Sequence, residues 1–557
     1  MEKLVLALPV LPLLSALLMV VLGPTRGRGV VRISTGAGVA TLLLAGVLLW
    51  LKLGGAPSST QDIGRWGSLL FDPLGLLMAF VITLISLLVR VYSVRYMADE
   101  SGYVRFFVVL DLMVAALLVM VTAGDLLVLL VAWHLIGVLL YLLLSHDLRS
   151  TSAHRYGLRT FITYRFGDLP LLLAALLLHR AYGTWSLPEI FRLVQERPDI
   201  ETVGGLPLVE VVAALVALAA FARSAQFLLH TWLPYTMEGP TPVSALMHAG
   251  IVNAGGFLIN RFAPLFVHTD QVLHGVFLVG LVTALAGSAL MLTRSDVKKS
   301  LGYSTMGQMG FMTMECGVGA FSLAIFHLIA HGLFKGTLFL NSGSGIGEAR
   351  RHDGVPKDDM YTFVIEKQPQ TKRYPWLVIA VTTTLVPLAV LGLAHAAIAP
   401  EVFTQQGAVV LLFFGWVTGA RLVVSSYRMH VQNTWRLGIV IVTSFTLVVI
   451  GYTAISHSFA LFLYPDGMVT QLYDAAHLGL QTLMVLLVVV AIVGLAGWAS
   501  AHYVTRGAAS ERNAVSRWRV SFYAALSREF YVADAYALLT RGLLSASARV
   551  NTWLRWG

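Results

Sequence analysis

Three neighbouring motifs decide the fold: ARSAQ at 222–226, HTWLP at 230–234 and EGPTPVSALMH at 238–248. They place prolines, glycines and ionisable side chains inside long apolar runs. Proline removes a backbone donor and breaks the helical hydrogen-bond ladder, so the freed carbonyl groups need polar neighbours or water at membrane depth. The stretch therefore predicts a broken membrane helix with Arg223 and His248 beside a wet pocket. The alternative is a structural kink in which Arg223 reaches a membrane interface.

The residues expected to form this break are Pro234, Gly239, Pro240 and Pro242. A later apolar run also contains a proline, Pro387. Ionisable groups in hydrocarbon cost several kcal/mol on most scales, so those embedded in such runs usually face a polar interior or an ion path. We therefore expect a protein that moves a charged species or transmits force along a polar axis.

The rest of the chain reads as a polytopic α-helical membrane protein. Of its 557 residues only 12% are charged, against about 25% in a soluble domain, and the mean hydropathy is +0.76. Continuous apolar runs near 20 residues mark spanning helices, and we expect about fifteen, the first retained at 4–22 rather than cleaved as a signal peptide. The stretch 518–550 is either a sixteenth span or a helix lying in the membrane interface.

The excess of basic residues indicates topology rather than nucleic-acid binding. The net charge is +10, but the Lys and Arg residues cluster in short loops after the odd-numbered spans. By the positive-inside rule those loops are cytoplasmic and the N-terminus lies outside, in a bacterial inner membrane, with anionic lipid as the partner of the basic loops. The single cysteine, Cys316, excludes an internal disulfide framework, a Cys-rich zinc site and an iron–sulfur cluster.

Two further groups of ionisable residues carry candidate chemistry. His327, His331 and Lys335 fall at i, i+4 and i+8 and share one helix face. No carboxylate or thiol lies nearby in the sequence and the Lys would repel a cation, so a proton relay fits better than a metal site. Histidines that merely pack against neighbouring helices remain the alternative. Arg165 and Asp168 are three residues apart on a helix and could pair, for a structural or a functional purpose.

A shorter basic motif adds two residues to the predicted ion path: Lys298 and Lys299, just before Tyr-Ser-Thr-Met at 303–306.

These segments together resemble the antiporter-like subunits of respiratory complex I and of multisubunit cation/proton antiporters. The motifs that carry the resemblance are Gly-Pro-Thr-Pro-Val-Ser-Ala-Leu at 239–246, Tyr-Ser-Thr-Met at 303–306, the run 325–335 and the tail 529–534. The resemblance implies two inverted five-helix repeats with broken helices 7 and 12. It divides the chain into helices 1–3 (1–100), a first repeat (101–262), a second repeat (263–430) with a cytoplasmic loop at 345–375, and C-terminal helices with an amphipathic tail (431–557).

The chain departs from the family pattern at three ion-path positions. The family places a Glu after a Trp in helix 5, and here that position is His134. It places a Lys before Ser-Ala-Gln in helix 7, and here that residue is Arg223, which cannot deprotonate in practice. In helix 12 its Lys position corresponds to Ala396, beside His395. His248, His327, His331 and Lys335 match the family pattern. The three departures imply that the ion path of this chain is altered.

These departures favour one branch of the family, the DabB membrane subunits of inorganic-carbon transporters. That branch implies a cytoplasmic, DabA-like zinc partner that resembles a β-carbonic anhydrase, and a flow of protons or sodium ions through this chain. The chain shows no catalytic triad, nucleotide loop or metal-ligand set, so we expect catalysis and zinc in the partner. The rival functions are a proton-pumping subunit of complex I or a related hydrogenase or Mrp complex, and a structural membrane anchor.

The long polar loop is the candidate contact for that partner. It mixes basic and acidic residues, which suits an oriented protein contact more than lipid binding alone, although a solvated connector is the alternative. The docking residues predicted in this loop are Arg350, Arg351, Asp353, Lys357, Asp358 and Asp359.

Overall fold

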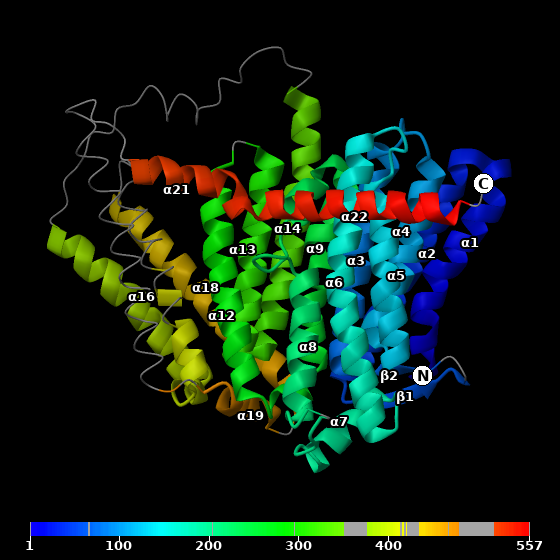
Figure 1. Cartoon of the computed structure of the whole chain (residues 1–557). Helices are drawn as coiled ribbons and strands as arrows, with labels where there is room; N and C mark the ends of the chain where they lie inside the picture. The colour runs from blue at the N-terminus through cyan, green and yellow to red at the C-terminus, as the bar shows by residue number, and fades with distance from the viewer. Residues whose placement is uncertain are drawn as a thin grey trace.

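The computed structural model describes residues 2–64, 67–202, 204–294, 296–349, 376–412, 434–465, 467–477 and 517–555, with the single positions 415, 416, 419 and 479. Long helices stand side by side in a bundle (Figure 1). They are α1 (Ala7–Arg26), α2 (Val31–Leu53), α3 (Pro73–Tyr96), α4 (Tyr103–Thr122), α5 (Leu126–Leu144), α6 (Thr151–Tyr182), α8 (Leu208–Arg223), α12 (Asp270–Met291), α13 (Val297–Gly317), α14 (Phe321–Ala349), α16 (Trp376–Ile398) and α18 (Thr434–Leu463).

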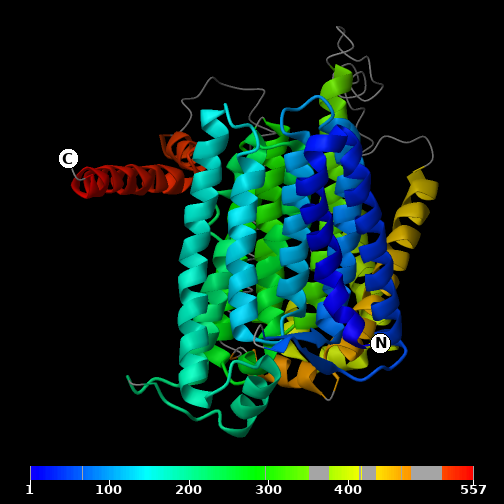
Figure 2. The same cartoon turned by 90° about the vertical axis from the view of Figure 1, so that its right-hand side faces the viewer.

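Shorter elements connect and cover these helices. The short α-helices are α7 (Leu187–Glu196), α9 (Thr241–Ala249), α10 (Ala254–Arg261), α11 (Ala263–Phe266), α19 (Met468–Ala475) and α21 (Arg517–Ser527). The 3-10 turns are η1 (Glu2–Leu6), η2 (Gly27–Val30), η4 (Leu233–Glu238), η5 (Ile251–Asn253), η6 (Pro400–Phe403) and η7 (Glu529–Tyr531). Strands β1 (Ser59–Asp62) and β2 (Ser68–Phe71) form an antiparallel hairpin at the end of the bundle where the chain begins (Figures 1 and 2).

The predicted fold class is confirmed. Ten helices in the described part of the chain are long and apolar enough to cross a membrane. The spans predicted at 407–428 and 479–503 lie largely outside the described residues. Helix α14 continues to Ala349, so residues 345–349 of the predicted polar loop are helical. The rest of that loop, with all six predicted docking residues, lies outside the described residues.

The break predicted after Arg223 is present. Helix α8 ends there, and the buried chain that follows has positive φ angles at Ala225 (48°) and Leu228 (74°) before η4 begins. Pro234 and Pro242 lie in the first turns of η4 and α9, where a backbone N–H would have no acceptor within the helix. Pro240 directly precedes α9. The break therefore costs few hydrogen bonds.

The second predicted break is absent. Helix α16 is continuous from Trp376 to Ile398 with Pro387 inside it. A proline in a helix interior removes one hydrogen bond, and a helix can continue past it with a bend. A Cβ atom at Gly419 would lie 2.9 Å from Cβ of Pro387, so a neighbouring segment packs closely on this proline.

The N-terminal helices share a buried polar contact. Nη2 of Arg90 on α3 lies 2.5 Å from Oδ1 of Asp111 on α4, and both side chains are almost completely buried. Ser15 of α1 donates to Asp111 Oδ2 at 2.6 Å, and Ser34 of α2 donates to Oδ1 at 3.0 Å. A Cβ atom at Gly38 would lie 2.1 Å from Arg90 Nη1, so only glycine fits there. One ion pair thus joins four helices.

Replacing Asp111 with alanine should destabilise the fold by about 3–5 kcal/mol, because Arg90 then stays buried without its counter-charge. Thermal unfolding in lipid nanodiscs measures this loss. Ser15→Ala is the matched control, since it removes one hydrogen bond and should cost only about 1 kcal/mol. An Asp111→Ala chain as stable as the wild type would contradict the proposed role of the pair.

The C-terminal helix lies across the bundle and does not span it. Helix α22 (Val532–Leu554) runs roughly perpendicular to the long helices at the end opposite to the hairpin, and Figure 2 shows it extending outward from the bundle. This direction contradicts a sixteenth span at 518–550, and the position of the helix in the membrane interface stays a prediction. From Arg541 onward every described side chain with an assigned exposure is exposed.

Candidate functional site

Asp168 on α6 is the centre of the first charged cluster. Its Oδ2 lies 2.9 Å from Nη2 of Arg165 and 3.0 Å from Nδ1 of His134, and its Oδ1 lies 3.4 Å from Nη2 of Arg223. The sequence predicts Arg165 as its partner, and the structure pairs it with Arg165 and with Arg223. One carboxylate therefore compensates two guanidinium groups, and His134 from α5 completes the group.

Arg223 is held at the break by aromatic rings as well as by charge. Its side chain is fully buried, so the alternative in which it reaches a membrane interface is excluded. Its guanidinium carbon lies 4.5 Å from the ring centre of Trp133 and 4.1 Å from that of Tyr164, and Nη2 donates to the Trp133 carbonyl. Cation–π contacts are strongest away from water, so this environment fixes a permanent positive charge in the bundle.

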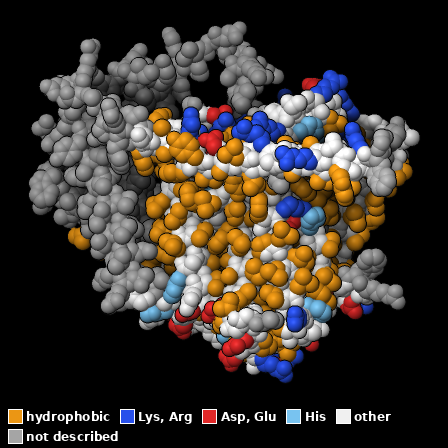
Figure 3. All heavy atoms as spheres, in the orientation of Figure 1, with side chains coloured by type: hydrophobic (Ala, Val, Ile, Leu, Met, Phe, Trp, Pro, Cys, Tyr) orange, Lys and Arg blue, Asp and Glu red, His pale blue; other side chains and the backbone are white. Residues whose placement is uncertain are grey.

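The cluster reaches the outside of the bundle at His134. Its side chain is 54% exposed, against 23% for Arg165 and 14% for Asp168. In the view of Figure 3, basic, acidic and His atoms gather in a small group within the hydrophobic band of the surface. A polar group in such a band is costly to leave against lipid, so this part of α5 and α6 is suited to contact with another protein or with water.

A second group lies between α9 and α14. His248, His331 and Lys335 are 0%, 6% and 2% exposed. A Cβ atom at Gly332 would lie 2.5 Å from the Ala249 carbonyl, so the two helices approach most closely beside His248 and His331. The His248 ring stacks on Phe339 with 4.3 Å between ring centres.

The side chains of this group differ in whether they have hydrogen-bond partners. Nζ of Lys335 donates to Ser304 Oγ at 2.9 Å. Among the described residues, no ring nitrogen of His248 or His331 has a hydrogen-bond partner. Buried polar atoms almost always have a protein or water partner, so these two histidines suit a hydrated interior.

More unpartnered polar atoms lie along the chain between the break and α10. Within the described part of the chain they are Gln226 Oε1, both ring nitrogens of His230, Thr231 Oγ1, Ser244 Oγ and Asn253 Oδ1. All belong to the segment from the end of α8 to the start of α10. Buried waters typically make about three hydrogen bonds each to such groups. A polar axis from Arg223 to Lys335 is the arrangement that these side chains support.

Glu315 is a carboxylate that the sequence analysis missed. His327 Nδ1 lies 3.0 Å from Oε1 of Glu315, and its Nε2 lies 2.8 Å from Oε1 of Gln308. Glu315 and Gln308 come from α13, twelve and nineteen residues away from His327, and only helix packing brings them together. No local pattern in the sequence marks Glu315.

The other predicted path residues lie elsewhere. Lys298 donates to Thr241 Oγ1 at 3.3 Å, and Lys299 lies 5.6 Å from the Tyr235 ring centre, so both stand at the end of the polar axis where α13 begins. His395 lies between α16 and α18, 2.9 Å from the Leu391 carbonyl and 3.4 Å from Thr453 Oγ1. In the described structure it makes no hydrogen bond with the other path residues.

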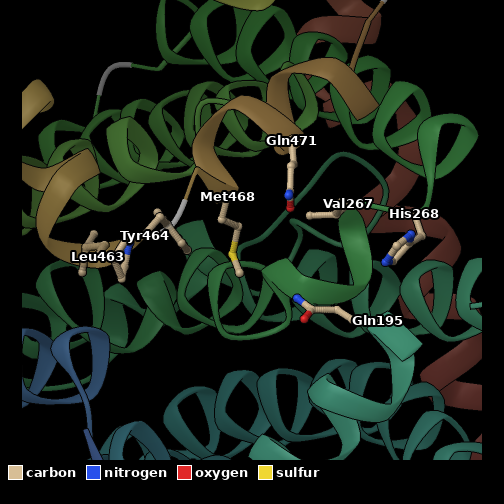
Figure 4. Close-up of a pocket in the computed structure, with 8 residues that line it drawn as sticks. Gln195, Val267, His268, Leu463, Tyr464, Met468 and Gln471 are labelled. Atoms are coloured by element: carbon tan, nitrogen blue, oxygen red, sulfur yellow. The ribbon is translucent and has the colours of Figure 1, made fainter. Parts of the chain in front are cut away.

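A hollow of about 680 Å³ lies away from this axis, near the end of the bundle where the hairpin is found. Figure 4 shows the residues that line it, which come from α7 and from the ends of α11 and α18 and include Met468 and Gln471 of α19. None of the predicted ion-path residues contributes to it. No group of three or more His, Cys, Asp or Glu residues that could hold a metal ion is found among the described residues.

Comparison with known proteins gives a consistent family. The family described as "NADH:quinone oxidoreductase/Mrp antiporter, TM" matches residues 123–422, and "NADH-Ubiquinone oxidoreductase (complex I), chain 5 N-terminus" matches residues 66–107. The chain is 53% identical to the "Probable inorganic carbon transporter subunit DabB1" of Halothiobacillus neapolitanus, over 99% of each chain. It is 38% identical to the NAD(P)H-quinone oxidoreductase chain 5 of Synechocystis, over 58% of this chain and 49% of that protein.

Two solved structures share the fold. The Mrp complex of Dietzia matches with a TM-score of 0.61 and 23% identity, over 99% of this chain and 60% of that chain. The archaeal membrane-bound sulfane sulfur reductase matches with a TM-score of 0.61 and 17% identity, over 85% of this chain and 99% of that chain.

Proposed function

Because the chain belongs to the family of antiporter-like membrane subunits shared by NADH:quinone oxidoreductases and Mrp antiporters, we propose that it is the cation-conducting subunit of an inorganic-carbon transporter. Protons, or sodium ions, flow through the polar axis and energise a cytoplasmic partner that hydrates CO₂ to bicarbonate. The observation that carries the proposal is the match to the DabB1 subunit, which is 53% identical over 99% of each chain.

The coupling is required by thermodynamics. A carbonic anhydrase by itself only equilibrates CO₂ and bicarbonate, so net accumulation needs a free-energy input. One charge moving down 100 mV releases about 2.3 kcal/mol. That energy corresponds to roughly a 50-fold concentration ratio. The free energy released by cation flow through this chain is therefore large enough to make hydration effectively one-way.

The polar axis suits a proton relay. A neutral imidazole accepts at one nitrogen and donates from the other, so His248 and His331 can pass a proton between waters. Lys335 can hold and release a proton, whereas Arg223 remains charged and sets the local potential. His327 continues the line through Glu315, which can also accept a proton.

The departures from complex I separate the proposed function from its nearest rival. Arg223 and His134 replace the Lys and Glu expected for the family, and both lie against the Asp168 carboxylate of this chain. The match to the quinone oxidoreductase chain covers only 49% of that protein. A complex I subunit without these groups should pump poorly by the usual route. A passive membrane anchor would have no use for a buried axis of titratable groups.

The proposal is tested by growth and uptake. In a bacterium that lacks carbonic anhydrase, this chain and its partner together should support growth in air and accumulate ¹⁴C-labelled bicarbonate. A protonophore should abolish accumulation if protons are the cation, and a sodium ionophore should do so if sodium is. Accumulation that persists when both gradients are dissipated would overturn the proposal.

Removing residues 350–375 should release the partner and leave the bundle folded. This segment is charged and polar in sequence, so we expect the bundle to fold without it. Pull-down in detergent measures how much of a DabA-like zinc protein stays bound. The prediction includes the orientation of the chain, with this loop in the cytoplasm. A chain shortened in the hairpin connection at 63–67 is the control and should keep its partner. Undiminished binding after removal of 350–375 would place the contact elsewhere.

A further inference from the structure

The turn between the two C-terminal helices inserts a carboxylate into the bundle. Glu529 belongs to η7, at the edge of the molecule, yet it is only 2% exposed. The Oη of Tyr235 donates to its Oε1 at 2.7 Å, and Nη2 of Arg294 lies 3.5 Å from the same oxygen. Its Oε2 is buried without a partner among the described residues. A carboxylate is rarely buried unless it is paired, so this contact is a built feature of the fold.

The backbone of the turn is strained to make this contact. Glu529, Phe530 and Tyr531 have φ angles of 57°, 53° and 62° in succession. Left-handed residues other than glycine are energetically unfavourable and occur singly as a rule. A plain surface linker would need no such geometry. The strain is held by the Glu529 contacts and by Phe530, whose ring packs edge-on against Phe227 at 5.9 Å.

The contact joins the lateral helix to the broken one. Tyr235 lies on η4, directly after the break, and Arg294 precedes α13. Arg159 of α6 lies 5.1 Å from the Tyr235 ring centre and 5.7 Å from that of Tyr536 on α22. Its Nη2 also donates to the Ala533 carbonyl at 3.4 Å. The first turn of α22 and the segment after the break are therefore held by the same side chains.

We propose that Glu529 is a positioning residue for the cation path: its carboxylate fixes η4 against the start of α13 and ties the lateral helix α22 to the broken helix. The inference rests on the proposed function. The buried Glu529 carboxylate is a contact that α22 and the segment after the break share, through its hydrogen bond with Tyr235. Lys299, a predicted ion-path residue, lies over the same Tyr235 ring and therefore beside this contact.

The test combines activity with a distance. Glu529→Gln keeps the shape but removes the charge, and it should lower cation-driven bicarbonate accumulation about tenfold, as expected for loss of a charged hydrogen bond. Spin labels at Leu148→Cys and Val550→Cys report the position of α22, because the single native cysteine is buried. The distance distribution should be narrow in the otherwise native chain and broad in the Glu529→Gln chain.

Two variants keep the test decisive. Tyr235→Phe, which removes only the hydroxyl, should shift both readouts in the same direction by a smaller amount. Asp534→Asn removes an exposed carboxylate one turn along α22 and should leave both unchanged. Unchanged accumulation or an unchanged distance distribution in Glu529→Gln would overturn the positioning role. If Glu529→Gln has no effect while His331→Ala abolishes accumulation in the same assay, the positioning role fails and the proposed function stands. If the wild-type chain with its partner accumulates no bicarbonate, the proposed function fails instead.

Discussion

Replacing His331 with alanine is expected to abolish bicarbonate accumulation while the chain still folds and binds its partner. His331 lies in the middle of the polar axis, between His327 and Lys335 on the same face of α14, and alanine can neither accept nor donate a proton. Groups that transfer protons in the rate-determining step typically contribute 10²- to 10⁴-fold, so a loss of at least about 100-fold is expected. Uptake of labelled bicarbonate measures it, with size-exclusion chromatography as the check of assembly.

His268→Ala is the matched control for this experiment. His268 lines the hollow at the other end of the bundle, away from the axis, and its replacement should leave uptake at the wild-type level. A fully active, normally assembled His331→Ala chain would refute the relay. Loss of activity in both variants would show that the assay reports general damage to the fold.

Replacing Arg223 with glutamine is expected to change the pH dependence of accumulation as well as its rate. The positive charge faces Asp168, with Arg165 and His134 sharing that carboxylate and Tyr164 lying against the guanidinium. Without Arg223 the negative charge of Asp168 is less compensated, so the electrostatic potential in the cluster becomes more negative. The pH of half-maximal accumulation should move in the alkaline direction, and the maximal rate should fall about tenfold or more, by loss of the buried charge pair.

The Arg223 result is read from uptake measured across external and internal pH in proteoliposomes. Arg192→Gln removes an arginine that pairs with Glu196 on the exposed face of α7, and it should change neither rate nor pH profile. An Arg223→Gln chain that is stable and slow but keeps the wild-type pH profile would show that Arg223 acts through packing alone.

The candidate site was only partly visible in the sequence. Arg223, His248, His331 and Lys335 stand out because an ionisable residue in an apolar run is unusual wherever it lies in space. Glu315 and Glu529 do not stand out, because acidic residues near helix ends and in short turns are common. Their importance depends on burial against His327 in one case and against Tyr235 and Arg294 in the other. The ion-path roles of all these residues remain predictions for the experiments above.

Pro387 shows the opposite error, and His395 lies apart from the other path residues. Both were singled out by alignment with a family pattern, and in the described structure His395 contacts only α16 and α18, while Pro387 lies within a continuous helix. A proline predicts a break only where the surrounding packing also releases the helix. After Arg223, the break combines residues with positive φ angles and the three prolines Pro234, Pro240 and Pro242. In α16, the segment around Gly419 packs against Pro387 and the helix continues.

The sequence by itself determined that this chain is a polytopic helical membrane protein with a break after Arg223, because both depend on the local order of apolar residues and prolines. Tertiary structure alone decided which charges meet. Arg223 and Asp168 are 55 residues apart, and Tyr235 and Glu529 are 294 residues apart. It also decided that the last helix lies across the bundle. Such contacts depend on the packing of whole helices against one another, and no local pattern encodes that packing.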